Sequence, residues 1–264
     1  LLECEIKNER LVLLQLHGGG YIGGMRNAYR SFAGLYSELG RGMSVLTVDY
    51  RVAPEHPYPA ALEDAITGYN WLLQAGWQEH EIVVAGDSAG GGLALALCMY
   101  LKNQNRKLPA GLICMPWTDL TQSGASYDFN YERDPLFGNT RDSLIYSKDY
   151  IQDEDPTNPY ISPLYGNFSG FPPMLIQVGS YEMLLSDSEL VAEKAKRAGC
   201  KVRLSVYEGM FHIFQMAMLM IPESKHAWQE IGRFLDIMEH HLPAEHLDEE
   251  DKEIESKFGE VEYE

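Results

Sequence analysis

Residues 86–91 read Gly-Asp-Ser-Ala-Gly-Gly and lie between a short β-branched run and a longer apolar segment. The run at 81–86 predicts a buried strand, and the segment at 89–103 has the length and composition of a buried helix. A Gly-x-Ser-x-Gly sequence at such a junction is typical of a nucleophile elbow, a sharp turn that exposes a serine hydroxyl. A plain glycine-rich turn would explain the letters alone, but the strand and helix around them favour the elbow. Ser88 is therefore a candidate nucleophile, and we expect its backbone to be strained.

Short β-branched runs alternate with segments of helical period on both sides of this junction. The alternation predicts an α/β fold with a mostly parallel central sheet and helices on both faces. The strand-like runs are residues 10–17, 43–51, 81–86, 111–117, 173–179 and 201–208. The helix-like segments are residues 27–39, 60–75, 89–103, 187–198 and 223–241. Residues 118–169 are rich in Tyr, Asp, Asn and Pro, and we expect an excursion from the sheet there, a candidate roof over the site.

Length and composition favour one domain over residues 1–243, followed by an acidic tail at 244–264. A chain of 264 residues with 45% apolar residues is expected to bury one sizeable core. The tail holds ten acidic residues against Lys252 and Lys257, a large part of the net charge of −18. Such a surface repels phosphate backbones and anionic lipid, so neither nucleic acid nor a membrane is expected as a partner.

Nothing in the sequence predicts a membrane anchor or a secretion signal. The apolar runs fall short of the roughly 20 residues that span a bilayer, and no basic stretch followed by an apolar one opens the chain. The cysteines, at positions 4, 98, 114 and 200, form no Cys-x-x-Cys pair and are interpreted as reduced and structural. These features lead us to expect a cytoplasmic location.

A second glycine-rich stretch, His-Gly-Gly-Gly-Tyr at 17–21, ends the first strand-like run. Three successive glycines allow backbone N–H groups to turn toward a substrate oxygen, as in the oxyanion holes of lipases and esterases. We assign Gly19 and Gly20 to an oxyanion hole, with the N–H of Ala89 as a third donor. A phosphate-binding loop would need Gly-Lys-Ser/Thr or Gly-x-Gly-x-x-Gly, and neither is present. His17 is interpreted as a structural residue of the turn.

Five stretches together resemble the hormone-sensitive-lipase-like family of α/β-hydrolases, which includes bacterial carboxylesterases and acetyl esterases. They are HGGG at 17–20, DYRVAPEHPYPAA at 49–61, GDSAGG at 86–91, PWTDL at 116–120 and YEGMFH at 207–212. They occur in the family's order, and the resemblance that they carry spans most of residues 11–240. The resemblance implies an α/β-hydrolase fold and a catalytic triad in the chain order serine, acid, histidine.

Two residues complete the triad that the resemblance implies. His212 follows the last strand-like run and a short turn, which is the family's place for the general base. Family members usually carry aspartate in a tract like Glu-Tyr-Asp-Pro-Leu after the preceding strand, and Glu182 stands there in this chain. We assign Glu182 as the orienting acid. Asp187 is its competitor, but its place before an amphipathic segment predicts a helix N-cap.

The resemblance also bears on the acyl pocket. Relatives have several dozen more residues ahead of the first strand, which form part of a lid, so we expect a short or missing N-terminal lid and a more open pocket. The candidate pocket residues are Tyr21, Met183, Phe211 and Phe214.

These assignments predict a serine carboxylesterase that hydrolyses short-chain acyl esters through an acyl-enzyme intermediate. No metal or organic cofactor is required, and the expected partner is a small-molecule ester. Lactone or amide hydrolysis on the same triad stays open. A non-catalytic small-molecule receptor of the same fold also stays open. Plant gibberellin receptors are such proteins, but they have lost the catalytic histidine, whereas this chain keeps a histidine at that place, His212. The resemblance suggests a monomer or a homodimer.

Overall fold

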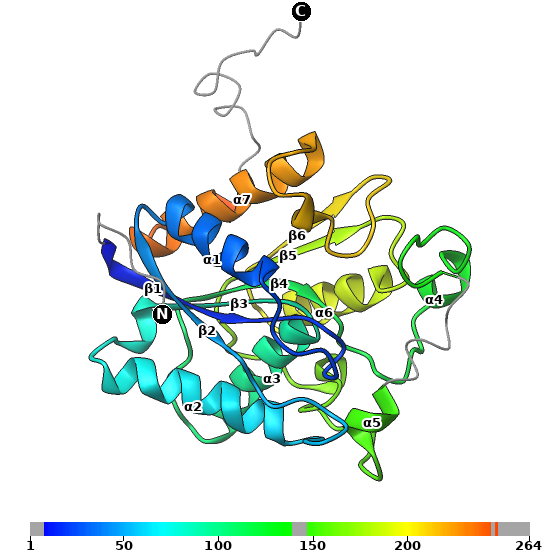
Figure 1. Cartoon of the computed structure of the whole chain (residues 1–264). Helices are drawn as coiled ribbons and strands as arrows, with labels where there is room; N and C mark the ends of the chain where they lie inside the picture. Colours follow the sequence, from blue (N-terminus) through cyan, green and yellow to red (C-terminus); the bar gives the residue numbers. More distant parts are fainter. Residues whose placement is uncertain (1–7, 139–146, 244–245, 248–264) are drawn as a thin grey trace, which may run out of the picture.

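The computed structural model describes residues 8–138, 147–243 and 246–247. In these ranges six strands form one sheet in the order β2-β1-β3-β4-β5-β6 (Figure 1). They are β1 (Asn8–Leu16), β2 (Met43–Val48), β3 (Ile82–Ser88), β4 (Gly111–Pro116), β5 (Met174–Gly179) and β6 (Val202–Tyr207). All neighbouring pairs are parallel, so the carboxyl ends of the strands meet at one edge of the sheet. In open α/β sheets that edge is where ligands bind.

Helices cover both faces of the sheet (Figure 1). On one face lie α1 (Ala28–Leu39) and α7 (Pro222–Glu239), and on the other α2 (Ala60–Gln74), α3 (Ala89–Asn103) and α6 (Leu185–Arg197). The strands supply both cores because successive side chains point to opposite faces. In β1, Leu11 and Leu13 join the cluster under α1 and α7, whereas Val12 and Leu14 join the cluster under α2 and α3.

The predicted fold class is confirmed, and each predicted strand and helix is present with its ends within three residues of the expected ones. The largest difference is at the end of β2, predicted to reach residue 51 but ending at Val48. The chain leaves the sheet there because Tyr50 and Arg51 form hydrogen bonds with residues outside the β2 pairing. The Tyr50 hydroxyl donates to the carbonyl oxygen of His17 at 2.5 Å, and the Arg51 backbone N–H donates to Asp64 at 2.8 Å.

The excursion predicted at 118–169 contains two short helices, α4 (Ser126–Phe129) and α5 (Ser147–Ile151), and a 3-10 turn at Pro163–Tyr165. The predicted acidic tail lies outside the described residues except for 246–247. Three of the four cysteines fall in the described ranges, where they are free and buried. Within the same ranges, no helix combines the length and hydropathy that crossing a membrane would need.

Candidate active site

Ser88 lies at the turn between β3 and α3, at the carboxyl edge of the sheet. Every residue of β3 is buried, and the strand lies in the interior of the strand order. The φ of 52° and ψ of −124° at Ser88 fall in a region that residues with a Cβ avoid, so the expected strain is confirmed. Gly90 in the same turn lies so close to the carbonyl oxygen of Leu16 that a Cβ would collide with it. The glycine thus allows the elbow to approach β1 closely.

Glu182 and His212 form a buried pair beside this edge. Glu182 follows β5 and His212 follows β6, and the two strands are neighbours in the sheet. Oε2 of Glu182 lies 2.7 Å from Nδ1 of His212. Oε1 of Glu182 accepts a hydrogen bond from the backbone N–H of Gly179 at 2.6 Å. Because Nδ1–H donates to the carboxylate, Nε2 of the neutral imidazole carries a lone pair rather than a proton.

The surroundings of His212 favour its protonated form. Burial alone would lower the pKa of His212, but the charge of Glu182 and its hydrogen bond outweigh burial. The more distant charges of Asp134 and Asp87 act in the same direction, so the pKa of His212 lies above its usual value. Among the described residues, Nε2 of His212 has no hydrogen-bond partner. That nitrogen is therefore free to take a proton from a group in the adjoining cavity.

The glycine loop after β1 is bonded to the serine elbow through Tyr29. The N–H of Gly18 donates to the Tyr29 hydroxyl at 2.8 Å, and this hydroxyl donates to Oδ2 of Asp87 at 2.8 Å. Burial raises the pKa of Asp87 to about 6, against the hydrogen bond from Tyr29, which lowers it. Since the N–H of Gly18 is engaged, Gly19 and Gly20 are the loop's other backbone donors beside the cavity.

His17 supports this loop, in agreement with its interpretation from the sequence as a structural residue of the turn. Its buried ring donates from Nδ1 to the carbonyl oxygen of Gly18 at 2.7 Å and stacks on Tyr50 with ring centroids 4.0 Å apart. Burial lowers the pKa of His17, which keeps the ring neutral. A neutral, stacked and hydrogen-bonded imidazole fixes the start of the glycine loop.

Two residues of the excursion hold the loop that carries the acid, and the sequence analysis missed them. The Asn130 side chain donates to the backbone oxygens of Ser180 at 2.9 Å and Glu182 at 2.8 Å. The Asp134 carboxylate accepts a hydrogen bond from the N–H of Met183 at 2.8 Å. The partners are 49 to 52 residues apart in the chain, so no local pattern indicates these contacts.

The N-cap predicted at Asp187 is wrong. The helix α6 begins at Leu185, which places Asp187 inside its first turn, where the side chain is buried. Its Oδ2 accepts hydrogen bonds from the backbone N–H groups of Thr118 at 2.7 Å and Asp119 at 2.8 Å. Burial raises the pKa of Asp187 to about 7, although these hydrogen bonds lower it. Asp187 thus ties α6 to the loop after β4, while Glu182 is the carboxylate on His212.

A cavity of about 440 Å³ brings the serine, the histidine and the glycine loop together. Its lining residues are Gly18, Gly19, Gly20, Ile22, Arg26, Tyr29, Ser88, Trp117, Leu136, Phe137, Leu184, His212, Ile213 and Met216. The volume lies in the range of small-molecule sites, and the wall is mostly apolar, as is usual for them. Leu136 and Phe137 come from the excursion, and the Phe137 ring centroid lies 5.1 Å from that of His212.

The predicted pocket residues Tyr21, Met183, Phe211 and Phe214 lie outside this lining, and the prediction is corrected here. Tyr21, Met183 and Phe214 are fully buried in the core, and Phe211 packs against the cluster that contains Phe214. Tyr21 has a φ of 62°, and its ring stacks on Tyr150 in the interior with centroids 3.9 Å apart. Adjacent residues line the cavity instead, namely Ile22, Leu184 and Ile213.

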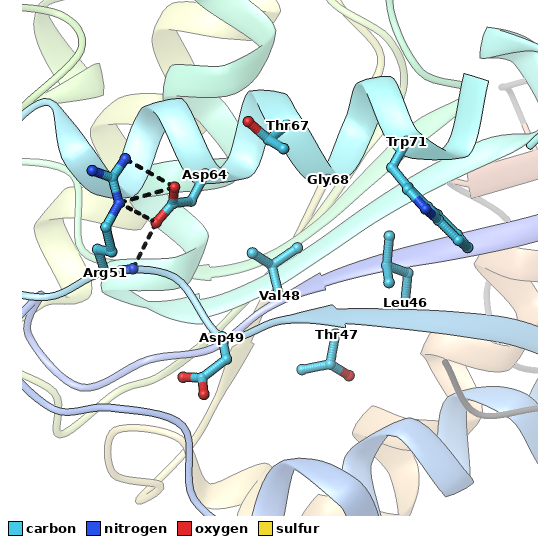
Figure 2. Close-up of a pocket in the computed structure, with 9 residues that line it drawn as sticks. All are labelled: Leu46, Thr47, Val48, Asp49, Arg51, Asp64, Thr67, Gly68 and Trp71. Carbon is cyan, nitrogen blue, oxygen red and sulfur yellow. Dashed lines mark hydrogen bonds and ion pairs between the residues drawn. The ribbon is translucent and has the colours of Figure 1, made fainter. Parts of the chain in front are cut away.

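A second hollow, also of about 440 Å³, lies between β2 and α2 (Figure 2). Val48 and Trp71 supply apolar wall, and the Arg51 guanidinium faces Asp64, with Nε 2.9 Å from Oδ2. The strand β1 separates β2 from β3, the strand that ends in Ser88. The hollow is lined by no serine, cysteine or histidine, so the cavity beside Ser88 is the candidate active site.

Among the described residues, one group of side chains near the end of α7 has ligand atoms close enough together for a cation, namely Asp236, Glu239 and His240. Asp236 pairs with Arg41 at 2.5 Å. None of the three lines the catalytic cavity. We treat them as a surface ion-pair cluster.

Known proteins of similar sequence and structure are esterases. The model of a family described as having the α/β-hydrolase fold matches residues 13–216. An esterase of Acinetobacter venetianus is 40% identical over 228 residues, 84% of this chain and 74% of that protein. An acetyl-hydrolase of Streptomyces hygroscopicus is 38% identical over 224 residues, with 84% and 74% covered. A solved esterase of the bacterial hormone-sensitive lipase family has a TM-score of 0.85 and 36% identity, covering 91% of this chain and 80% of that one.

The sheet topology and the serine elbow define a class of enzymes, the α/β-hydrolases. Within that class, the chain belongs to the hormone-sensitive-lipase-like family. Relatives and structural neighbours of this chain are carboxylic ester hydrolases, which confirms the predicted family and enzyme class.

Proposed function

We propose that this protein is a serine carboxylesterase that hydrolyses short-chain acyl esters through an acyl-enzyme intermediate. The main support is one arrangement. Ser88 and His212 line the same cavity as the glycine loop, and Nδ1 of His212 is hydrogen-bonded to the carboxylate of Glu182. A nucleophile, a base oriented by a buried acid, and backbone donors are the parts that acyl transfer needs. The names of the relatives support the ester as substrate.

In the first half-reaction, the Ser88 hydroxyl attacks the ester carbonyl while Nε2 of His212 takes its proton. The oxyanion that forms accepts hydrogen bonds from the N–H groups of Gly19, Gly20 and Ala89. Ala89 is the first residue of α3, where backbone N–H groups have no partner within the helix and the helix dipole favours negative charge. His212 then protonates the leaving alcohol.

In the second half-reaction, His212 activates a water molecule that attacks the acyl-enzyme, and the acid leaves as Ser88 regains its proton. Glu182 keeps the Nδ1 proton in place and stabilises the imidazolium that forms in both halves. The proton therefore moves only between Ser88, His212, the alcohol and water.

The test of this mechanism is Ser88→Ala, with Ser31→Ala on the exposed face of α1 as a matched control. Removing the nucleophile of a coupled triad is expected to lower turnover by about 10⁶-fold. A serine-directed organophosphate should label the wild type once, at Ser88, and the control variant equally. Substantial activity in Ser88→Ala, or a label on another serine, would overturn the assignment.

The preference for short acyl chains rests on the size of the cavity and on the acidic charge of the chain, −18. A series of nitrophenyl esters of increasing acyl length should show the highest kcat/KM at acetyl to butyryl, and a maximum at palmitoyl would contradict the proposal. One lactone and one anilide in the same series decide between the ester and the alternative substrates. A receptor would bind such compounds without turnover. We further propose that the protein is cytoplasmic and that it is a monomer or a homodimer.

A further inference from the structure

Among the described residues that line the catalytic cavity, one side chain is permanently charged, that of Arg26. It lies in the loop between the glycine turn and α1, where its carbonyl oxygen accepts a hydrogen bond from the N–H of Tyr29 at 3.0 Å. Arg26 lines the same cavity as Ser88 and His212, and the described lining includes no aspartate or glutamate. A cation on a mostly apolar wall is one of the few polar groups that can orient a ligand there.

Within the described ranges, no carboxylate pairs with Arg26. Elsewhere the structure pairs Arg41 with Asp236, Arg51 with Asp64, and Arg203 with Glu230. The net charge is −18, so acidic partners are abundant. Arg26 is an exposed residue, so its guanidinium is solvated in the free protein, but it lines the cavity beside Ser88, where an anionic group of a bound ester can replace that water.

Asp87, the buried carboxylate beside Gly18 and Tyr29, does not pair with Arg26. Asp87 takes its hydrogen bond from the Tyr29 hydroxyl and is screened from the cavity, with 2% of its surface exposed. Burial and Asp87 raise the pKa of Tyr29, and the charge of Arg26 acts in the opposite direction. Arg26 thus lines the cavity together with the glycine loop and has no carboxylate partner among the described residues.

We propose that Arg26 is a specificity determinant of the ester substrate, and that it selects esters bearing a carboxylate or another anionic group remote from the scissile bond. This inference rests on the proposed esterase function. Ser88 and the glycine loop take the ester carbonyl, the apolar wall takes the connecting chain, and Arg26 takes the anion through charge-assisted hydrogen bonds. The substrate is then either a monoester of a short dicarboxylic acid or a hydroxy acid whose hydroxyl is acylated and whose carboxylate is free.

Four esters test this inference and separate its two sources of negative charge. The 4-nitrophenyl monoester of adipate carries the anion on the acyl side, and 4-nitrophenyl hexanoate is its neutral match. For the alcohol side, 4-carboxyphenyl hexanoate is compared with 4-acetylphenyl hexanoate. The measured quantity is the ratio of kcat/KM for the anionic ester to that for its neutral match, so general effects on activity cancel.

Arg26→Ala should lower one of these ratios by about five- to tenfold. That loss lies between the contribution of an exposed ion pair and that of a charge-assisted hydrogen bond. Arg26→Glu should lower it further. The control is Arg30→Ala, which removes the same charge from an exposed position on α1 that does not line the cavity, and it should leave both ratios unchanged. The ratio that falls identifies the side of the ester that carries the anion.

Two results would overturn the inference: both ratios unchanged in Arg26→Ala, or an equal change in Arg30→Ala. Hydrolysis of the neutral esters by the wild type reports separately on the proposed function. If the wild type hydrolyses neither these four esters nor the acetyl and butyryl nitrophenyl esters, that function fails. Calorimetric binding of monomethyl adipate then decides the inference alone, with weaker binding to Arg26→Ala expected and equal binding contradicting it.

Discussion

The Tyr29 hydroxyl lies 2.8 Å from Oδ2 of Asp87, the residue that precedes Ser88, and links two segments 58 residues apart. The same hydroxyl accepts a hydrogen bond from the N–H of Gly18. One phenol therefore bridges the glycine loop and the serine elbow. Since oxyanion donors act only when they are correctly placed before the reaction, this link bears on the rate of the chemical step.

Tyr29→Phe should lower kcat by about tenfold with a smaller effect on KM, because misplaced donors weaken transition-state binding more than substrate binding. It should also destabilise the fold by about 1–3 kcal/mol, since a buried carboxylate and an N–H lose their partner. Tyr69→Phe is the control, as its buried hydroxyl has no partner among the described residues. Unchanged kcat in Tyr29→Phe would show that the phenol has no positioning role.

Glu182→Gln should lower kcat by about 10⁴-fold, the effect of losing the orienting acid in a serine protease triad. The amide can present its N–H₂ to His212 and so favour the wrong tautomer. Asp187→Asn is the matched control, since that side chain bonds to Thr118 and Asp119 rather than to the imidazole. A severe loss in Asp187→Asn with near-normal Glu182→Gln would reverse the assignment.

The pH profile of kcat/KM on a neutral ester should rise through an apparent pKa above about 6.5, the ordinary value for histidine. His212 must be neutral to act as the base, and Glu182 raises the pKa of His212 against the effect of burial. In Glu182→Gln the smaller effects of Asp134 and Asp87 remain, but burial is then the largest influence on the pKa of His212, so the acidic limb of the residual activity should move to lower pH. A shift to higher pH would contradict this account of the pair.

Asp187 should make the stability of the wild type depend on pH. Burial raises the pKa of Asp187 to about 7, so its contribution to stability is full below the pKa of the unfolded chain and is lost as pH rises through about 7. Asp187→Asn lacks this titration. The stability of the variant relative to the wild type should therefore increase between about pH 5 and about pH 8, on the order of 2 kcal/mol. Denaturant unfolding of both proteins at the two pH values measures it, and a constant difference would refute it.

The elements that follow from local patterns could be predicted from the sequence. The elbow at Ser88 needs only a buried strand, two glycines and an apolar helix in succession, and these stand together in residues 81–103. The triad partners could be placed by the resemblance. The contacts of Tyr29, Asn130 and Asp134 could not, because each joins loops that meet only after the strands have taken their order in the sheet.

The errors in the pocket have a common physical cause. Tyr21, Met183 and Phe214 are large apolar residues close to the catalytic segments, which favours them as pocket lining when composition is the only guide. In loops, however, backbone angles such as the positive φ of Tyr21 decide which of two adjacent side chains faces the cavity. The alternation that identifies inward and outward residues along a strand does not extend into those loops.

The edge position of β6 in the sheet bears on the order in which activity and secondary structure are lost in denaturant. β6 is an edge strand whose middle residues are partly exposed, whereas β3 lies inside the sheet and is buried throughout. Poorly buried elements open locally at a lower free energy than the core of a protein. His212, which follows β6, is thus tethered to a segment that frays early, while Ser88 sits in one of the last to open. In mild denaturant, inactivation should accordingly precede the loss of bulk secondary structure.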